Sequence, residues 1–190
     1  MRFLYAVGIL YLLVSISLLF SDVVLSPQEQ QKPAVALQPN IPGNSWFEQI
    51  RPHCNAVEVD THLRSNPAPQ TLEGKAYAAA CYGLAGKIDE ARALINHLPL
   101  VQRTYAAGVV FGVGHPVADA GDDRSAGPMM RLTIEYQPDN YMALYHAGIS
   151  EHILGEYSMS RQHLVRFLEL YHEDDFYSRK AKEVLALLPD

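Results

Sequence analysis

Apolar side chains recur at helical spacing through most of the chain after residue 70, and the pattern is clearest between residues 140 and 171. The regularly spaced positions are Leu144, Ala147 and Gly148 in the first half of this stretch and Leu164, Phe167 and Leu168 in the second. Gly155, Glu156 and Tyr157 separate the two halves, and a glycine can adopt the left-handed conformation that ends a helix. This pattern predicts a hairpin of two helices, 140–154 and 158–171.

A set of small residues repeats three times with nearly the same spacing. The turn glycines Gly86, Gly121 and Gly155 are 35 and 34 residues apart. Seven residues before each glycine is another small residue: Ala79, Gly114 and Gly148. Five residues after each glycine is a third small residue: Ala91, Ala126 and Ser160. Nine residues after each glycine is a large apolar residue: Ile95, Met130 and Leu164. Helices approach each other closely where the side chains at their crossing are small. The period therefore predicts an array of helical hairpins.

The middle unit, residues 107–138, contains a proline within each of its expected helices, at Pro116 and Pro128. A proline inside a helix removes one hydrogen bond and costs about 3 kcal/mol. We therefore expect shortened or kinked helices in this unit.

The helical pattern extends beyond the repeats at both ends. Residues 46–50 predict a short helix over the open end of the array. Asn55 and Glu58 have the spacing of a capping box, which would start a helix spanning about 56–65. Residues 176–188 predict a closing helix with one polar face.

The amino-terminal region has a different composition. Residues 3–20 form an uncharged apolar run that spans about 27 Å as a helix, close to the thickness of a bilayer core. We expect residues 1–20 to form a signal anchor, or else a signal peptide, although no typical cleavage site follows. Residues 21–44 contain four prolines and predict a flexible linker. The helical repeat domain, residues 45–190, would then be membrane-anchored and extracytoplasmic; the alternative is secretion after cleavage.

Charge and motifs exclude some function classes. The net charge of −6 and the absence of a basic run argue against nucleic-acid binding. The chain has no His-Glu-x-x-His motif, nucleophile elbow or phosphate-binding loop. We therefore expect no enzymatic activity, no catalytic residue, no cofactor and no metal.

The segment 112–124 contains His115, Asp119, Asp122 and Asp123, whose side chains could ligate a metal. Their spacing matches no dedicated calcium loop. We favour the interpretation that Asp122 and Asp123 cap the following helix. A domain that binds a metal or a small ligand through this loop is the alternative function.

Cys54 and Cys81 are the only cysteines. They would lie on opposite arms of a turn near residue 68, so they could form a disulfide worth about 3 kcal/mol in an exported protein. Two buried free thiols are the alternative.

The two outer units resemble the tetratricopeptide repeat family. Residues 72–98, with the turn Gly86-Lys87-Ile88, and residues 141–172, with the turn Gly155-Glu156-Tyr157, have its small residues and turn. The resemblance implies an all-α fold, a short right-handed solenoid of antiparallel helix hairpins. It also implies a scaffold that binds peptides and has no common catalytic residue.

In such arrays the first helix of each pair typically lines the concave side. The resemblance therefore implies that this protein is an adaptor that binds a peptide or a partner helix in a groove. The expected groove residues are Phe111, His115, Asp119, Met142, Tyr145, Ile149 and His152. The alternative is that Tyr145 and Phe111 are ordinary core residues.

Overall fold

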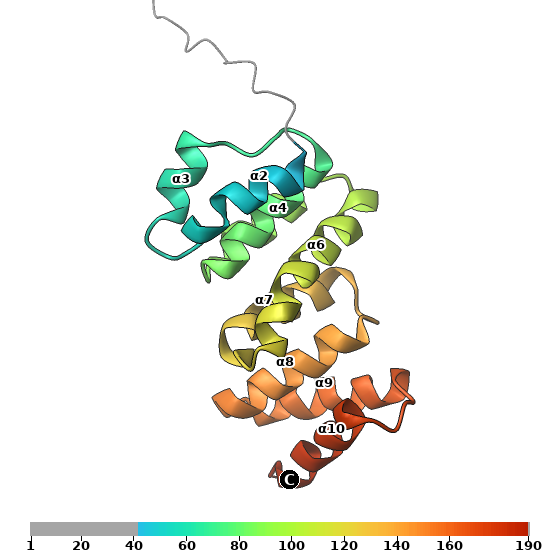
Figure 1. Cartoon of the computed structure of the whole chain (residues 1–190). Helices are drawn as coiled ribbons and strands as arrows, with labels where there is room; N and C mark the ends of the chain where they lie inside the picture. Colours follow the sequence, from blue (N-terminus) through green and yellow to red (C-terminus); the bar gives the residue numbers. More distant parts are fainter. Residues whose placement is uncertain (1–41, 190) are drawn as a thin grey trace, which may run out of the picture. The chain divides into compact units, whose positions relative to one another are not determined.

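The computed structural model describes residues 42–189, and every regular element within this range is a helix (Figure 1). The elements are α2 (Gly43–Ile50), η1 (Arg51–His53), α3 (Val59–Ser65), α4 (Leu72–Leu84), α5 (Ile88–Asn96), α6 (Leu100–Asp119), α7 (Asp123–Tyr136), α8 (Tyr141–Leu154), α9 (Tyr157–Leu170) and α10 (Phe176–Leu187). The all-α prediction is confirmed for these residues.

The expected anchor, residues 1–20, and residues 21–41 of the expected linker lie outside the described range. Helix α2 begins at Gly43, so the last two residues assigned to the linker belong to the helical part of the chain. Between residues 42 and 189, none of the helices combines the length and apolar character needed to cross a bilayer.

Three consecutive helix pairs, α4–α5, α6–α7 and α8–α9, form the predicted hairpins. Gly86, Gly121 and Gly155 lie between the helices of their pairs with φ angles of +72°, +89° and +79°. This left-handed conformation is strained for a residue with a Cβ, which explains why a glycine recurs at each turn. Side chains also start helices: Asn140 caps α8 by accepting a hydrogen bond from the amide of Ala143 at 3.0 Å.

The helices of a pair meet at the predicted small residues. A Cβ added to Gly148 would lie 2.6 Å from Cγ of Leu164, and one added to Gly114 would lie 2.8 Å from Cε of Met130. At the α8–α9 crossing the buried hydroxyl of Ser160 donates a hydrogen bond of 2.8 Å to the carbonyl of Gly148. The spacing of small and large residues therefore predicted which positions pack against each other.

We expected shortened or kinked helices at the prolines, and the structure shows that neither helix is shortened. Helix α6 continues through Pro116 for 20 residues, and α7 continues through Pro128 for 14 residues. Pro116 is exposed and lies in the last turn of α6, and it removes one backbone hydrogen bond. In α7 the residues that follow Pro128, Met129 and Met130, are fully buried, and each buried side chain of this size contributes about 1.5–3 kcal/mol. Tertiary packing therefore offsets the cost of the proline.

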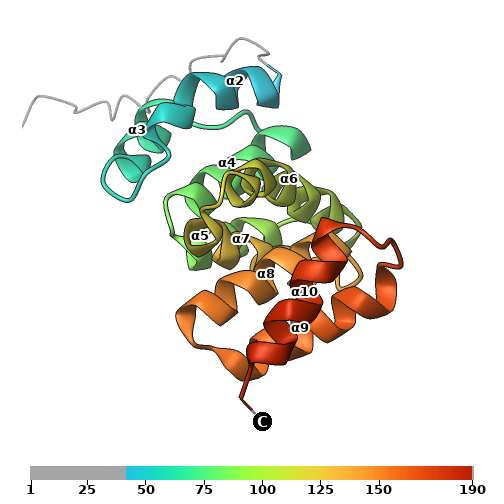
Figure 2. The same cartoon turned by 60° about the horizontal axis from the view of Figure 1, so that its bottom comes forward.

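Helices at both ends of the described range cover the hairpins (Figure 2). Trp46, Phe47 and Ile50 of α2 are buried in a cluster with residues of α4, as predicted. On the other side, α10 packs against α8 and α9 and buries Ala181 and Val184.

The segment between α2 and α4 differs in detail from the prediction. Asn55 Oδ1 accepts hydrogen bonds from the amides of Val57 and Glu58, but the Glu58 carboxylate accepts from the Asn55 side chain instead of its backbone amide. Helix α3 is accordingly regular only from Val59. A disulfide joins Cys54, directly after η1, to Cys81 of α4.

Candidate functional site

One face of α6 is nearly bare of side chains at its middle. Gly108, Gly112 and Pro116 are spaced by four residues and therefore lie along one side of the helix. A Cβ added to Gly112 would meet no atom within 4 Å, and one at Gly108 would meet only Nε2 of Gln137, at 3.1 Å. The backbone of α6 is thus accessible to a partner along this side.

A depression of about 360 Å³ lies between α6 and the helices α2 and α4. The wall opposite α6 consists of Phe47 and Glu48 of α2, Arg51 of η1 and Tyr77 of α4. The rings of Phe47 and Tyr77 stack with centroids 4.9 Å apart. Burial raises the pKa of the Tyr77 hydroxyl above its ordinary value. This wall offers aromatic surface bordered by one carboxylate and one guanidinium group.

A second depression, of about 570 Å³, lies between α6 and the start of α8. Its lining comprises Thr104 and Phe111 of α6, Tyr136 at the end of α7, residues 137–140 between α7 and α8, and Tyr141 and Met142 of α8. The bare face of α6 therefore has on each side a depression whose lining contains aromatic residues.

Exposed apolar side chains extend the bare face toward the start of α6. Val101 and Tyr105 lie on the same side of the helix as Gly108 and Gly112, with 88% and 48% of their surface exposed. Exposed apolar side chains that adjoin one another are characteristic of interaction sites. We call the surface formed by Val101, Tyr105, Gly108, Gly112 and the two depressions the α6 groove.

Two of the seven residues expected in a groove, Phe111 and Met142, line the second depression. Tyr145 and Ile149 instead lie in the core, and only 4% of the Tyr145 surface is exposed. Its ring lies 5.1 Å from that of Tyr177 in α10, so the closing helix covers the face of α8 that we expected to bind a partner. Burial raises the pKa of the Tyr145 hydroxyl strongly.

His152 is half-buried beside Tyr157, with ring centroids 6.1 Å apart, and does not line either depression. The remaining two expected residues, His115 and Asp119, face α8 and lie next to His146. Asp122 caps α7 by accepting a hydrogen bond from the amide of Ser125, whereas Asp123 contacts His146. The prediction that these two residues start the helix is therefore confirmed, with Asp122 as the cap and Asp123 as an acidic residue in the first turn, and Asp123 contacts His146 in addition.

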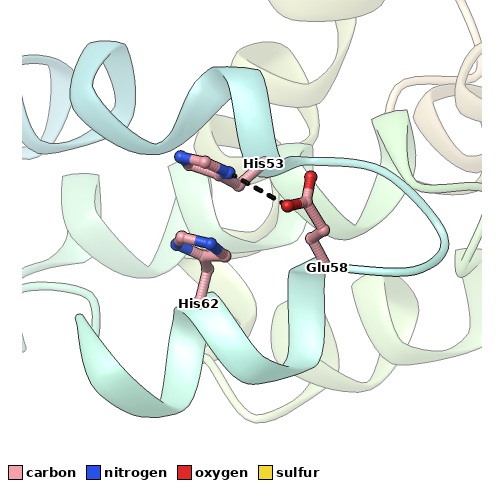
Figure 3. Close-up of side chains that lie close together, drawn as sticks. All are labelled: His53, Glu58 and His62. Carbon is pink, nitrogen blue, oxygen red and sulfur yellow. Dashed lines mark ion pairs between the residues drawn. The ribbon is translucent and has the colours of Figure 1, made fainter.

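A second histidine cluster consists of His53, Glu58 and His62 (Figure 3). Figure 3 shows the two imidazole rings one above the other, with centroids 3.6 Å apart and planes inclined by 7°. Glu58 Oε1 lies 3.6 Å from Nδ1 of His53. Imidazole lone pairs lie in the ring plane, so the nitrogens of parallel rings point side by side and do not converge on one ion.

Sequence reasoning missed several groove residues, namely Tyr77, Tyr105, Gly108, Gly112 and Tyr141. A pattern in the sequence could have indicated this surface: Gly108 and Gly112 are four residues apart, and Val101 and Tyr105 lie on the same face of the helix. His146 was missed because its neighbours come from two other helices, α6 and α7, and no linear spacing relates them.

Comparison with protein-family models, with curated proteins and with solved structures finds no match to this chain, so its function has to be inferred from the geometry alone.

Proposed function

We propose that this protein is a non-catalytic adaptor that binds an amphipathic helix of a partner protein in the α6 groove. The observation that carries the proposal is the bare stripe at Gly108 and Gly112, which has an aromatic depression on each side. Packed helices lie about 8–10 Å apart, and the shorter distances require small side chains at the contact. A helix lying over these glycines would place large apolar side chains into both depressions.

The charged residues at the edges of the groove indicate which charges the partner helix carries. Glu48 and Arg51 border the first depression, and Asp139 borders the second. A partner helix with an apolar stripe flanked by both charge signs would complement this arrangement.

We infer that the three hairpins form a short solenoid of the tetratricopeptide type, in which the first helices α4, α6 and α8 line the groove. The recurring turn glycines and small residues at the crossings support this assignment. We also propose that residues 1–20 anchor the protein and that residues 45–190 lie outside the cytoplasm. The Cys54–Cys81 disulfide supports export, because such bonds persist mainly in oxidising compartments.

The test fills the groove without disturbing the fold. Gly112→Leu adds a side chain where a Cβ meets open space, and it replaces a poor helix former by a good one. The variant should fold at least as stably as the wild type but lose the partner. Ala93→Leu, at an exposed position of α5, is the matched control for added apolar surface.

A photoreactive amino acid at Tyr105 of the full-length protein, expressed in its native membrane, reports the contact. We expect it to crosslink to a partner segment whose apolar residues recur every three to four positions, and we expect Gly112→Leu to abolish this crosslink. Equal crosslinking in the Gly112→Leu variant, or equal yield from a probe placed at Ala93, would reject the groove as the binding site.

A further inference from the structure

His115, Asp119 and His146 form a compact cluster where α6 ends and α8 passes beside it. Asp119 Oδ1 lies 3.7 Å from Nε2 of His115 and 3.4 Å from Nε2 of His146. One potential ligand atom from each residue lies within 4.8 Å of the others. His115 and Asp119 are one helical turn apart on the same face of α6, so the pair requires only a helix to form.

The orientation of the His146 ring is fixed by a fourth residue. Its Nδ1 lies 3.2 Å from Oδ1 of Asp123, the first residue of α7. A carboxylate only accepts hydrogen bonds, so Nδ1 is the donor in this contact and Nε2 is the ring nitrogen that faces the cluster. A carboxylate that orients a histidine in this way is the usual outer partner of a metal-binding imidazole.

The Nε2 atoms of His115 and His146 have no hydrogen-bond partner in the part of the protein that the structure describes. Only 4% of the His146 side chain is exposed, yet its Nε2 has no hydrogen-bond partner, and the same holds for Nε2 of His115. Both nitrogens instead face Asp119, which is itself an acceptor. A buried polar atom left without a partner costs about 1–3 kcal/mol, so this arrangement calls for a positive charge between the three side chains.

We propose that His115, Asp119 and His146 bind a divalent transition-metal ion of the zinc class. Ligand atoms held at about 2.0–2.2 Å from a tetrahedral zinc lie about 3.4 Å from one another, close to the observed separations of 3.4 and 3.7 Å. Two imidazole donors with one carboxylate favour zinc and its neighbours over calcium or magnesium, which prefer oxygen donors.

The exposure of the cluster leaves room for a fourth ligand. His146 and Asp123 are enclosed by the protein, whereas 43% of the Asp119 side chain and 26% of the His115 side chain are exposed. The site is therefore reachable from solvent, and a water molecule or a partner's side chain can complete the coordination. The proposal is independent of the α6 groove, since neither histidine lines a depression.

The His53 cluster provides an internal comparison. It also contains two histidines and one carboxylate, but its stacked rings do not direct their nitrogens to a common point (Figure 3). The rings of His115 and His146 are inclined by 69°, so their in-plane lone pairs can converge. A His62→Ala variant is therefore the matched control for loss of a histidine.

The experiment titrates the purified full-length protein with Zn²⁺ against a chromophoric chelator. We expect one equivalent to bind, with at least tenfold weaker binding in His115→Ala and in the isosteric Asp119→Asn. Asp123→Ala, which removes only the outer partner, should weaken binding by about 10- to 100-fold. His62→Ala should bind as the wild type does. With Co²⁺, the wild type should develop the intense visible absorption of tetrahedral coordination, and His115→Ala should not.

Three results would overturn the proposal. The first is the absence of a stoichiometric Zn²⁺ site in the wild type, which would indicate an imidazolium held between Asp119 and Asp123. The second is unchanged affinity in both His115→Ala and Asp119→Asn. The third is loss of binding in His62→Ala, which would place the metal at the other cluster. Circular dichroism of each variant verifies that its helices are intact.

Discussion

Three glycines inside helices, Gly112, Gly114 and Gly148, allow the packing argument to be tested by adding a single methyl group to each. Replacing glycine by alanine within a helix stabilises it by about 1 kcal/mol through backbone entropy. What differs among the three positions is the atom that the new Cβ would meet. Their predicted order of stability therefore depends on tertiary contacts alone.

At Gly112 the new Cβ meets nothing within 4 Å, so Gly112→Ala should gain about 1 kcal/mol, or about 2–4 °C in Tm. At Gly114 it lies 2.8 Å from Cε of Met130, the end of a flexible side chain that can rotate away. For Gly114→Ala, the cost of moving Met130 and the gain in helix propensity should therefore nearly cancel, and the free energy of unfolding should stay close to that of the wild type.

At Gly148 the new Cβ lies 2.6 and 2.7 Å from Cγ and Cδ2 of Leu164, whereas carbon atoms pack at about 3.5–4.0 Å. Leu164 is fully buried, so its branch would have to shift by about 1 Å within a filled core. Overpacking of this kind costs about 1–3 kcal/mol. After the helix-propensity gain, Gly148→Ala should still be destabilised, by up to about 2 kcal/mol.

Urea unfolding followed by circular dichroism measures these differences, and a Leu164→Ala background provides the decisive control. Without the Leu164 branch the clash is gone, so Gly148→Ala should become stabilising in that background. The reasoning is refuted if Gly148→Ala stabilises the otherwise wild-type protein as much as Gly112→Ala does.

Two further predictions concern single interactions. Replacing both Cys54 and Cys81 by serine should lower the free energy of unfolding by about 3.5 kcal/mol, the loop-closure value for their separation of 27 residues, and wild-type protein kept in reductant should show the same loss; unchanged stability in both would contradict it. The pKa of Asp175 lies below its usual 3.8, mainly because its carboxylate accepts a hydrogen bond from the Tyr171 hydroxyl. Hydrogen bonds from the amides of Ser178 and Tyr177 lower this pKa further. A lowered pKa in the folded state means that the carboxylate stabilises the protein above pH 3.8 and that this stabilisation disappears as the pH falls through the lower folded-state pKa. Asp175→Asn should therefore flatten the acid limb of a stability-against-pH curve; equal acid limbs in the wild type and Asp175→Asn would reject this assignment.

Much of the hairpin structure could be predicted from the sequence because it depends on local rules. Gly155 ends a helix because the turn requires a residue in the left-handed conformation, and this requirement depends only on the few residues around the turn. Gly148 and Leu164 could be paired because both lie at fixed distances from that turn. The candidate site was harder to predict. Phe111 and Met142 line a depression, whereas Tyr145 is buried, which was only the alternative interpretation because the helix that covers Tyr145 lies more than 30 residues away along the chain.

The amino-acid sequence by itself determined where α8, α9 and α10 begin and end to within a few residues, and which small positions face each other within a hairpin. Both properties follow from backbone conformation and from a periodicity of 3.6 residues. Only the tertiary structure decided that α6 and α7 continue through Pro116 and Pro128, and that His146 lies beside His115 and Asp119. These outcomes depend on how helices from different hairpins pack, where buried contacts outweigh local preferences and no spacing along the chain records which side chains will meet.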